Sequence, residues 1–468
     1  MKALLTALIF GIGLAAAAAQ QSPRLPKSLP PYGPVVPFHP PKVITRKLPN
    51  GLTLWLAPRP GYPKVSLAVA VRGGMSADPK ELPGLSYLLL DTIDQGTKSH
   101  SAQQIADAFQ AAGGDLYGTP LADSDVLTVS VLASKIRPAL SILSDVLQNA
   151  EFPDSQVALA KRNEQDALSA REAEPSFLAS RALAKALFGN HPYSVITQTH
   201  ASIAQATAAE LREQYAREFR PNAAVLVAVG DFDPVRFTDS AQELLGGWHS
   251  TAAVLPAIAP PANKDDHAVF LISRPGSVQT FFLLGSHSPT ERDPDFEAAE
   301  VANTIYGGMY GSLLFKQIRE AKGYSYSPHS LLSLRRQAGV LETELSVRNQ
   351  VSGASLADVL HLLNRMASTA PSAQQLLRAK RFLAGTQALR YQHQSAVARK
   401  FASLWVNGLP PDEIERESRS LQQITVGQVE AAGDRYFPAR RQMIVAVGDE
   451  AIIRQQLAPL GIPIKVVP

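Results

Sequence analysis

Three positions in one short segment have the spacing of a metal site but not its chemistry. The sequence predicts a helix within the stretch from Gly84 to Thr97. Tyr87, Leu90 and Asp91 stand at i, i+3 and i+4, so their side chains share one face of this helix. Two zinc ligands and a general base at this spacing can converge on one metal ion. Zinc takes imidazole, thiolate or carboxylate ligands, whereas leucine can neither bind metal nor accept a proton.

The elements around this helix mix strands and helices. Leu85, Leu88 and Leu89 predict a buried face on the helix itself. Hairpin signals such as Asn50-Gly51 outnumber regular strand–helix–strand repeats, which favours an α+β fold. The expected strands are 48–56 (broken by the turn), 65–71 and 125–133, and the expected helices are 101–112, 136–149 and 155–173.

A repeat divides the chain into two similar halves. The five residues Val227–Asp231 recur unchanged 218 residues later as Val445–Asp449. The same offset continues through the preceding helix, where it pairs Thr207 with Thr425. A continuous register over that length predicts two homologous domains related by internal duplication. We expect them at 43–248 and 267–468, joined by a proline-containing linker at 249–266.

The N-terminus indicates export. Lys2 precedes an apolar, alanine-rich run, so residues 1–19 are expected to be a cleaved signal peptide. A membrane anchor is the alternative, but the run is short for a span. Residues 20–42 are rich in proline and are expected to form an extended tether. The sequence therefore predicts a periplasmic protein with no membrane span after signal cleavage.

Composition excludes some function classes. The net charge of +4 comes from scattered basic residues, so nucleic acid is not an expected partner. The chain has no cysteine, which rules out disulfides and thiolate metal ligands. An exported protein of this composition must be stabilised chiefly by core packing.

A second candidate site lies in the other half. Gly307 and Gly308 open a glycine-rich bend; they either admit a substrate backbone or serve a tight turn, and they lack the context of a nucleotide-binding loop. Arg319 and Tyr326 follow, and a guanidinium with a phenol offers several donors to a carbonyl oxygen. Alternatively, Arg319 pairs with a helix neighbour and Tyr326 packs at the start of a strand.

The order of these segments resembles the pitrilysin and insulinase family, the M16 peptidases. The resemblance runs from about residue 43 to the C-terminus and matches the size and duplicated α+β halves of such chains. It rests on Leu48–Leu52, the Gly84–Thr97 frame, His191–Tyr193, Val229–Asp231 and Tyr306–Tyr326. The frame is similar to the one that holds the inverted zinc motif His-x-x-Glu-His.

The resemblance implies that the metal site is degenerate. Tyr87, Leu90 and Asp91 occupy the three motif positions, and the third ligand position falls at about Ala167. No zinc or other cofactor is therefore expected in this chain. Three nearby carboxylates could bind metal only with a different helix phase: Glu164, Asp166 and Glu172. Three loop histidines have no set spacing and are expected to be ordinary: His100, His191 and His200.

The resemblance also implies a function. Arg319 and Tyr326 match a pair that contacts the substrate main chain in the family, and Gly307 and Gly308 lie in the same signature. The chain therefore looks like the non-catalytic, substrate-binding subunit of an exported heterodimeric zinc metallopeptidase. A zinc-motif subunit would be its partner and unfolded peptides its substrate. The alternatives are a purely structural M16-like subunit and a peptidase with a rebuilt metal site.

We predict that the purified chain binds no stoichiometric zinc and cleaves no peptide, because all four metal-site positions carry unsuitable residues. Metal analysis and a peptide-cleavage assay with and without chelator check this. One zinc per chain together with chelator-sensitive cleavage would contradict it.

Overall fold

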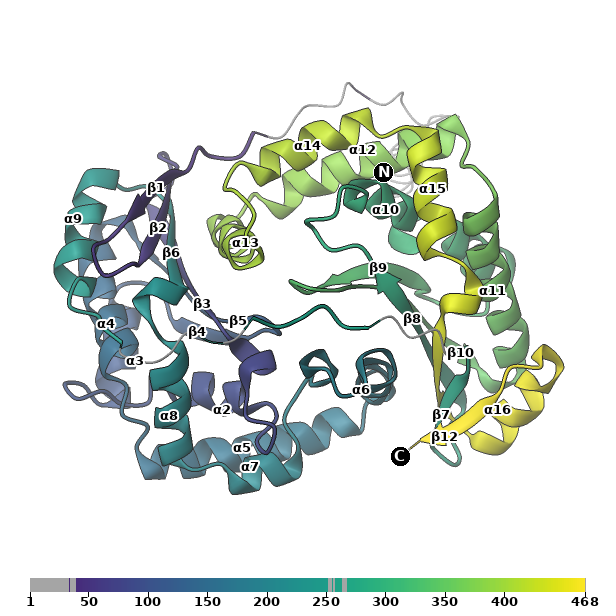
Figure 1. Ribbon diagram of the computed structural model, residues 1–468, viewed down its shortest axis with the longest axis horizontal. Coiled ribbons are helices and arrows are strands. Elements are labelled where there is room, and N and C mark those ends of the chain that lie inside the picture. Colours follow the sequence, from purple (N-terminus) through teal and green to yellow (C-terminus); the bar gives the residue numbers. More distant parts are fainter. Residues whose placement is uncertain (1–32, 34–38, 251–254, 256, 263–266, 468) are drawn as a thin grey trace, which may run out of the picture. The chain divides into compact units, whose positions relative to one another are not determined.

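The computed structural model describes residues 33, 39–250, 255, 257–262 and 267–467 (Figure 1). The expected signal peptide and most of the expected tether lie outside these residues, as does part of the linker. The domain boundaries within the linker therefore stay predictions.

The first sheet is mixed and has six strands in the order β1-β2-β6-β3-β5-β4. Only β2 and β6 pair in parallel. The turn at Asn50-Gly51 joins β1 to β2 as an antiparallel hairpin, which confirms the expected strand–turn–strand. The strands are β1 (Ile44–Lys47), β2 (Thr53–Pro58), β3 (Lys64–Arg72), β4 (Leu116–Pro120), β5 (Ser124–Leu132) and β6 (Ala224–Gly230).

Helices pack against this sheet from the same half of the sequence. Ser101 caps the second of them through a capping box, as its position predicted. The first ends at Thr92, earlier than Gly96, which the sequence had suggested as its end. The helices of this half are α2 (Leu85–Thr92), α3 (Ala102–Ala111), α4 (Ile136–Asn149), α5 (Asp154–Glu172), α6 (Pro175–Phe188), α7 (His200–Gln205), α8 (Ala208–Glu218) and α9 (Pro234–Leu245).

The second sheet repeats the plan of the first, with the order β12-β7-β11-β8-β10-β9. Its strands are β7 (Val269–Ser273), β8 (Gln279–Ser288), β9 (His329–Leu334), β10 (Gly339–Arg348), β11 (Met443–Gly448) and β12 (Ile464–Val467). Its helices are α10 (Phe296–Asn303), α11 (Ser352–Ser368), α12 (Ala373–Arg390), α13 (Gln394–Asn407), α14 (Glu413–Gln423), α15 (Val426–Tyr436) and α16 (Glu450–Leu457), with π-helical turns at Thr304–Gly308 and Phe315–Ala321.

The two topologies correspond strand by strand, which fits the expected duplication. Strands β2, β6, β3, β5 and β4 of the first sheet match β7, β11, β8, β10 and β9 of the second. The outer strand is the difference. β1 precedes β2 and pairs with it antiparallel, whereas β12 comes from the C-terminus and pairs with β7 in parallel. The fold is therefore the α+β duplication that the sequence predicted.

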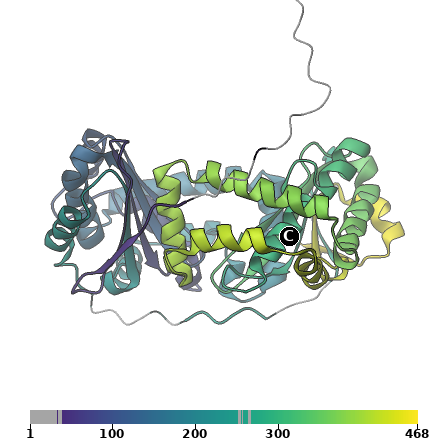
Figure 2. The same ribbon diagram turned by 90° about the horizontal axis from the view of Figure 1, so that it is seen from above.

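One helix from each half covers the sheet of the other half. α13 packs on β3 and β6, and α6 packs on β8 and β11 (Figures 1 and 2). α6 begins at Pro175 and α13 at Gln394, so the two occupy equivalent places in the repeat. The exchange is therefore reciprocal between the duplicated halves.

Close packing holds both exchanged helices. Phe401 of α13 is fully buried and meets Trp55 of β2 edge to face, with ring centroids 6.3 Å apart. Leu183 of α6 lies over Gly285 of β8, where a Cβ atom would come within 2.7 Å of its methyl group. Arg72 adds a polar link, because it donates to the carbonyl of Trp405 at 3.0 Å and stacks over that indole.

Within the described part of the chain, none of the helices combines the length and apolar character that a membrane crossing requires.

We predict that Phe401→Ala lowers the free energy of unfolding by about 3 kcal/mol or more, because it empties the contact between α13 and the first sheet. Urea denaturation followed by circular dichroism measures the change. Leu389→Ala is the control, since Leu389 is 63% exposed on α12 and should cost little. Equal effects of the two substitutions would contradict the prediction.

Candidate functional site

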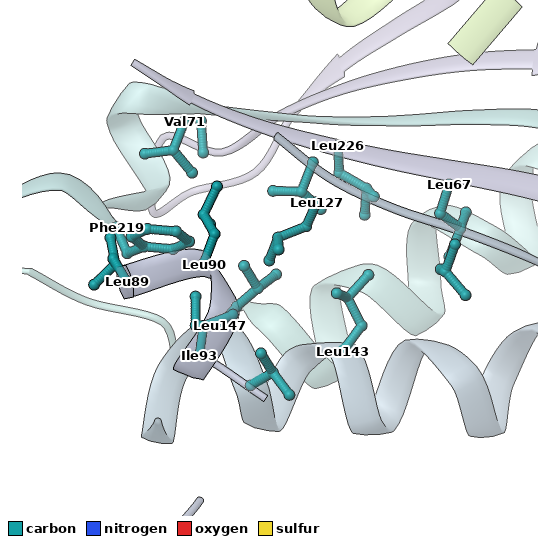
Figure 3. Close-up of a cluster of buried hydrophobic side chains, with 14 of the residues drawn as sticks. Leu67, Val71, Leu89, Leu90, Ile93, Leu127, Leu143, Leu147, Phe219 and Leu226 are labelled. Carbon is teal, nitrogen blue, oxygen red and sulfur yellow. The ribbon is translucent and has the colours of Figure 1, made fainter. Parts of the chain in front are cut away.

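Two of the three motif positions on helix α2 carry side chains that are engaged in packing or other contacts and not in metal binding. Its apolar face is buried as expected, with Leu85, Leu88 and Leu89 all inaccessible. Leu90 is buried too and belongs to the core between α2 and the first sheet (Figure 3). Gly118 of β4 lies so close that a Cβ atom there would be 2.8 Å from that of Leu90. The position of the family's general base therefore carries a core side chain.

Tyr87 is half-buried and held at both ends of its side chain. Its hydroxyl donates to the carbonyl of Ile196 at 3.3 Å. The guanidinium of Arg171, on α5, lies 5.5 Å from the centre of its ring. Such cation–π contact stabilises a tyrosine beside a basic group.

The facing helix supplies a carboxylate that the sequence analysis set aside. α5 packs on α2, and Glu164 hydrogen-bonds Asp91 across the contact. Arg171 donates to Glu164 at 3.0 Å, and the side-chain amide of Gln198 also donates to it. The expectation that Glu164 has the wrong helix phase is wrong, because residues three apart share a helix face and Ala167 follows it by three.

Asp91 holds its proton more strongly than a free aspartate does. Partial loss of water contact, the charge of Glu164 and the hydrogen bond to it raise the pKa of Asp91 to about 7, and Asp94 adds to this. Arg171 opposes the rise. Burial likewise raises the pKa of the Tyr87 phenol. Below about pH 7, a proton and a guanidinium therefore lie where the family's motif would hold a divalent cation.

These residues do not fit a zinc ion. Tyr87 and Asp91 are committed to α5 and to a carbonyl group, Leu90 lies in the core, and Ala167 has no donor. Across the described ranges, no group of three histidine, aspartate or glutamate side chains is placed to hold a metal. We derive no metal-dependent step for this chain.

The three histidines each have a separate structural partner. His100 contacts Asp145 at 2.8 Å, and His191 contacts the carbonyl of Ala259 at 2.8 Å. His200 lies 3.1 Å from Glu172 and is the first residue of α7 rather than part of a loop. The other two carboxylates are also elsewhere: Glu172 pairs with Arg181, and Asp166 is exposed.

Arg319 and Tyr326 stack on each other in the second half. The Arg319 guanidinium lies 4.3 Å from the centre of the Tyr326 ring and 4.8 Å from that of Phe315. Tyr326 is 79% exposed. No ion pair of Arg319 occurs among the described residues, so the helix-neighbour alternative is not what holds it. Two rings instead fix the guanidinium and leave its donors unpaired by carboxylate.

The pair borders an open hollow of about 540 Å³ on the second sheet. Glu344, Ser346 and Arg348 of β10 form its floor. Alternate strand residues share a face, and Ser346 pairs with Phe281, which belongs to the cluster under α6. The hollow therefore lies on the same sheet face as the exchanged helix α6.

The two glycines occupy a π-helical turn next to β9. Gly307 is buried, and a Cβ atom there would be 2.4 Å from the hydroxyl of Ser330. Gly308 lies against Asn303. Close packing of the turn therefore accounts for Gly307, and the lining of the hollow described above includes neither glycine.

Arg171, Gln198 and the role of Glu164 are not among the residues predicted from the sequence. A signal was present for two of them, because Glu164 and Arg171 are seven residues apart, two turns along one helix face. Gln198 comes from a loop, and its proximity follows only from the fold.

Two family models match the chain. The model described as Insulinase (Peptidase family M16) matches residues 56–199, and the one described as Peptidase M16 inactive domain matches residues 205–383. Together these matches cover more than two thirds of the 468 residues.

Individual proteins and solved structures are also similar to most of the chain. An uncharacterized zinc protease of Mycobacterium bovis is 25% identical over 408 residues, covering 86% of this chain and 92% of the relative. The non-peptidase homologue YmxG of Helicobacter pylori is 23% identical, covering 77% and 83%. A crystal structure titled peptidase M16 inactive domain, from Pseudomonas fluorescens, superimposes with a TM-score of 0.82 at 25% identity and covers 87% of this chain and 98% of that one.

The fold and the degenerate site define a duplicated peptidase-like protein whose zinc-motif positions carry unsuitable residues. The chain belongs to the M16 family.

We predict that Asp91→Asn stabilises the protein at pH 8 and does so less toward pH 5. Folded Asp91 keeps its proton up to about pH 7, whereas an unfolded aspartate loses it at about pH 4. Asp91 therefore lowers the stability of the wild type as pH rises between these values, and the neutral variant lacks this contribution.

Thermal denaturation from pH 5 to pH 8 measures the difference. Asp166→Asn is the matched control, because Asp166 is exposed on the same facing helix. A stability difference between Asp91→Asn and the wild type that does not change with pH would show that the pKa of Asp91 is ordinary.

Proposed function

We propose that this chain is the substrate-binding subunit of an exported heterodimeric M16 peptidase, with unfolded peptides as its substrates. The observation that carries the proposal is the stacked pair of Arg319 and Tyr326 at the edge of an open hollow. The degenerate site on α2 and α5 supports the assignment of metal chemistry to a different subunit. Export follows from the expected signal peptide.

The stacked pair suits recognition of a peptide main chain. A guanidinium held between two rings loses little conformational freedom on binding, and it presents several donors in a fixed plane. Tyr326 adds a hydroxyl that faces solvent. Together they can donate to a carbonyl oxygen as it gains negative charge during hydrolysis.

The adjacent strand gives a way to hold an extended peptide. Tyr326 precedes β9, which is the outer strand of the second sheet. An outer strand presents unpaired backbone groups, and a peptide can add to it as a further strand. Backbone pairing of this kind gives affinity without strict sequence preference.

A division of labour then follows. A zinc-motif partner would supply the metal and the general base, since the residues here do not fit them. This chain would bind the peptide and orient the reacting carbonyl. A purely structural role is the alternative, and it assigns no function to the exposed Tyr326.

We predict that Arg319→Ala lowers turnover of the complex with a zinc-motif M16 partner by about a hundredfold, because one donor to the developing charge is lost. Tyr326→Phe should have a milder effect, since it removes only the hydroxyl. Peptide hydrolysis by the co-expressed complex measures both.

Lys316→Ala is the matched control, because Lys316 is an exposed cation on the same π-helical turn. Gel filtration and metal analysis should show that assembly and zinc content are unchanged in all three variants. Full turnover in both Arg319→Ala and Tyr326→Phe would exclude substrate contact and leave the structural role.

A further inference from the structure

A cavity of about 670 Å³ shares no lining residue with the Arg319 hollow or with helices α2 and α5. Four arginines line it and come from three separate segments. Arg72 ends β3, Arg217 and Arg220 lie at and after the end of α8, and Arg336 lies in the turn between β9 and β10. Asp123 is the carboxylate in the lining. The wall is therefore strongly cationic.

Asp123 is already engaged by uncharged donors. It accepts from the hydroxyl of Tyr193 at 2.6 Å and from the backbone amide of Arg336 at 2.8 Å. Arg72 and Arg336 form no ion pair with it or with any other described residue. Asp123 thus fixes the turn that carries Arg336 rather than neutralising its side chain.

The arginines also retain unused donors. The Nε atoms of Arg72, Arg217 and Arg336 are buried and have no hydrogen-bond partner within the described chain. Burial and the nearby charge of Arg336 lower the pKa of Arg72. Guanidinium groups that line one cavity, with buried donors unpaired among the described residues, indicate a missing anionic partner.

The positive charge of the cavity wall is only partly offset by a buried carboxyl group, Glu218. Glu218 is buried beneath Gly73, where a Cβ atom would come within 2.5 Å of its carboxylate, and it lies 4.0 Å from Arg217. It also contacts the backbone amide of Gly74, the side chain of Gln214 and the buried carboxyl group of Asp125. Burial raises the pKa of Glu218 to about 8, so the cavity keeps an excess of positive charge.

One part of the cavity wall is apolar. The contact of His191 with the carbonyl of Ala259 ties this wall to the first half of the chain. Its members are small or aliphatic: Ala77, Pro192, Ala223, Ala257, Ile258 and Ala259. The volume exceeds that of a bare inorganic anion and suits an anionic group attached to an apolar body.

We propose that this cavity binds the C-terminal carboxylate of a peptide whose last side chain is apolar. The carboxylate would bridge Arg72 and Arg336, and the last side chain would lie against Ile258 and its neighbours. Arginine binds carboxylates through two parallel hydrogen bonds, which favours this arrangement. The site is distinct from the Arg319 hollow and needs no partner subunit.

The test is peptide binding by the isolated full chain, followed by fluorescence anisotropy. The probe is a fluorescein-labelled pentapeptide ending in leucine, compared with the same peptide as a C-terminal amide. The free carboxylate should bind at least about tenfold more tightly. Arg72→Gln and Arg336→Gln should each weaken its binding by at least about tenfold.

Arg46→Gln is the charge-matched control, because Arg46 is exposed on β1 and contacts only a neighbouring carbonyl. It should leave binding unchanged. Arg319→Ala is measured alongside it, to separate this site from the proposed substrate site. Thermal melting verifies that each variant is folded, and the comparison of carboxylate with amide needs no variant.

Equal binding of carboxylate and amide would overturn the proposal. So would tight binding of inorganic phosphate without binding of the peptide, which would assign the cavity to a free anion. Weakening by Arg319→Ala but not by Arg72→Gln would place the peptide at the Arg319 hollow instead.

Discussion

The exchange of α6 and α13 is the contact on which the rest of this structure depends. Each sheet has one face covered by helices of its own half and the other covered partly by a helix of the opposite half. An isolated half would expose the sheet face that the exchanged helix covers. The free energy gained by burying residues such as Phe401 of α13 would then be lost. The duplicated halves are therefore expected to fold as one cooperative unit, although each has its own core.

In the degenerate metal site, neighbouring charges compensate one another without a metal ion. Asp91 and Glu164 face each other across α2 and α5, and two like charges at that contact would repel. Arg171 supplies one positive charge and the raised pKa of Asp91 keeps a proton, so the pair is compensated without a metal. Leu90 meanwhile joins the core (Figure 3). The motif has become a structural contact between two helices.

Secondary-structure elements that depend on local sequence patterns were predicted well. The bounds of α4 matched the expected helix at 136–149, and the repeat foretold two sheets of the same plan. The exchange of α6 and α13 was not predicted, because a repeat shows that two helices are equivalent but not which sheet each one covers. Glu164 was misplaced through an error of helix phase. Arg319 was grouped with Tyr326 through their resemblance to a family motif, but their stacking depends on side-chain geometry that spacing does not give.

The two halves differ in which polar groups remain available to a ligand. On α2 and α5, Tyr87 and Glu164 each have a hydrogen-bond partner in the protein, so fewer of their polar atoms are available to a ligand. Arg319 is the opposite case, since aromatic rings hold it without consuming its hydrogen-bond donors. An ion pair would have oriented the same guanidinium but would have competed with an incoming carbonyl. Orientation by stacking alone keeps the donors available, which is the property a substrate-positioning arginine requires.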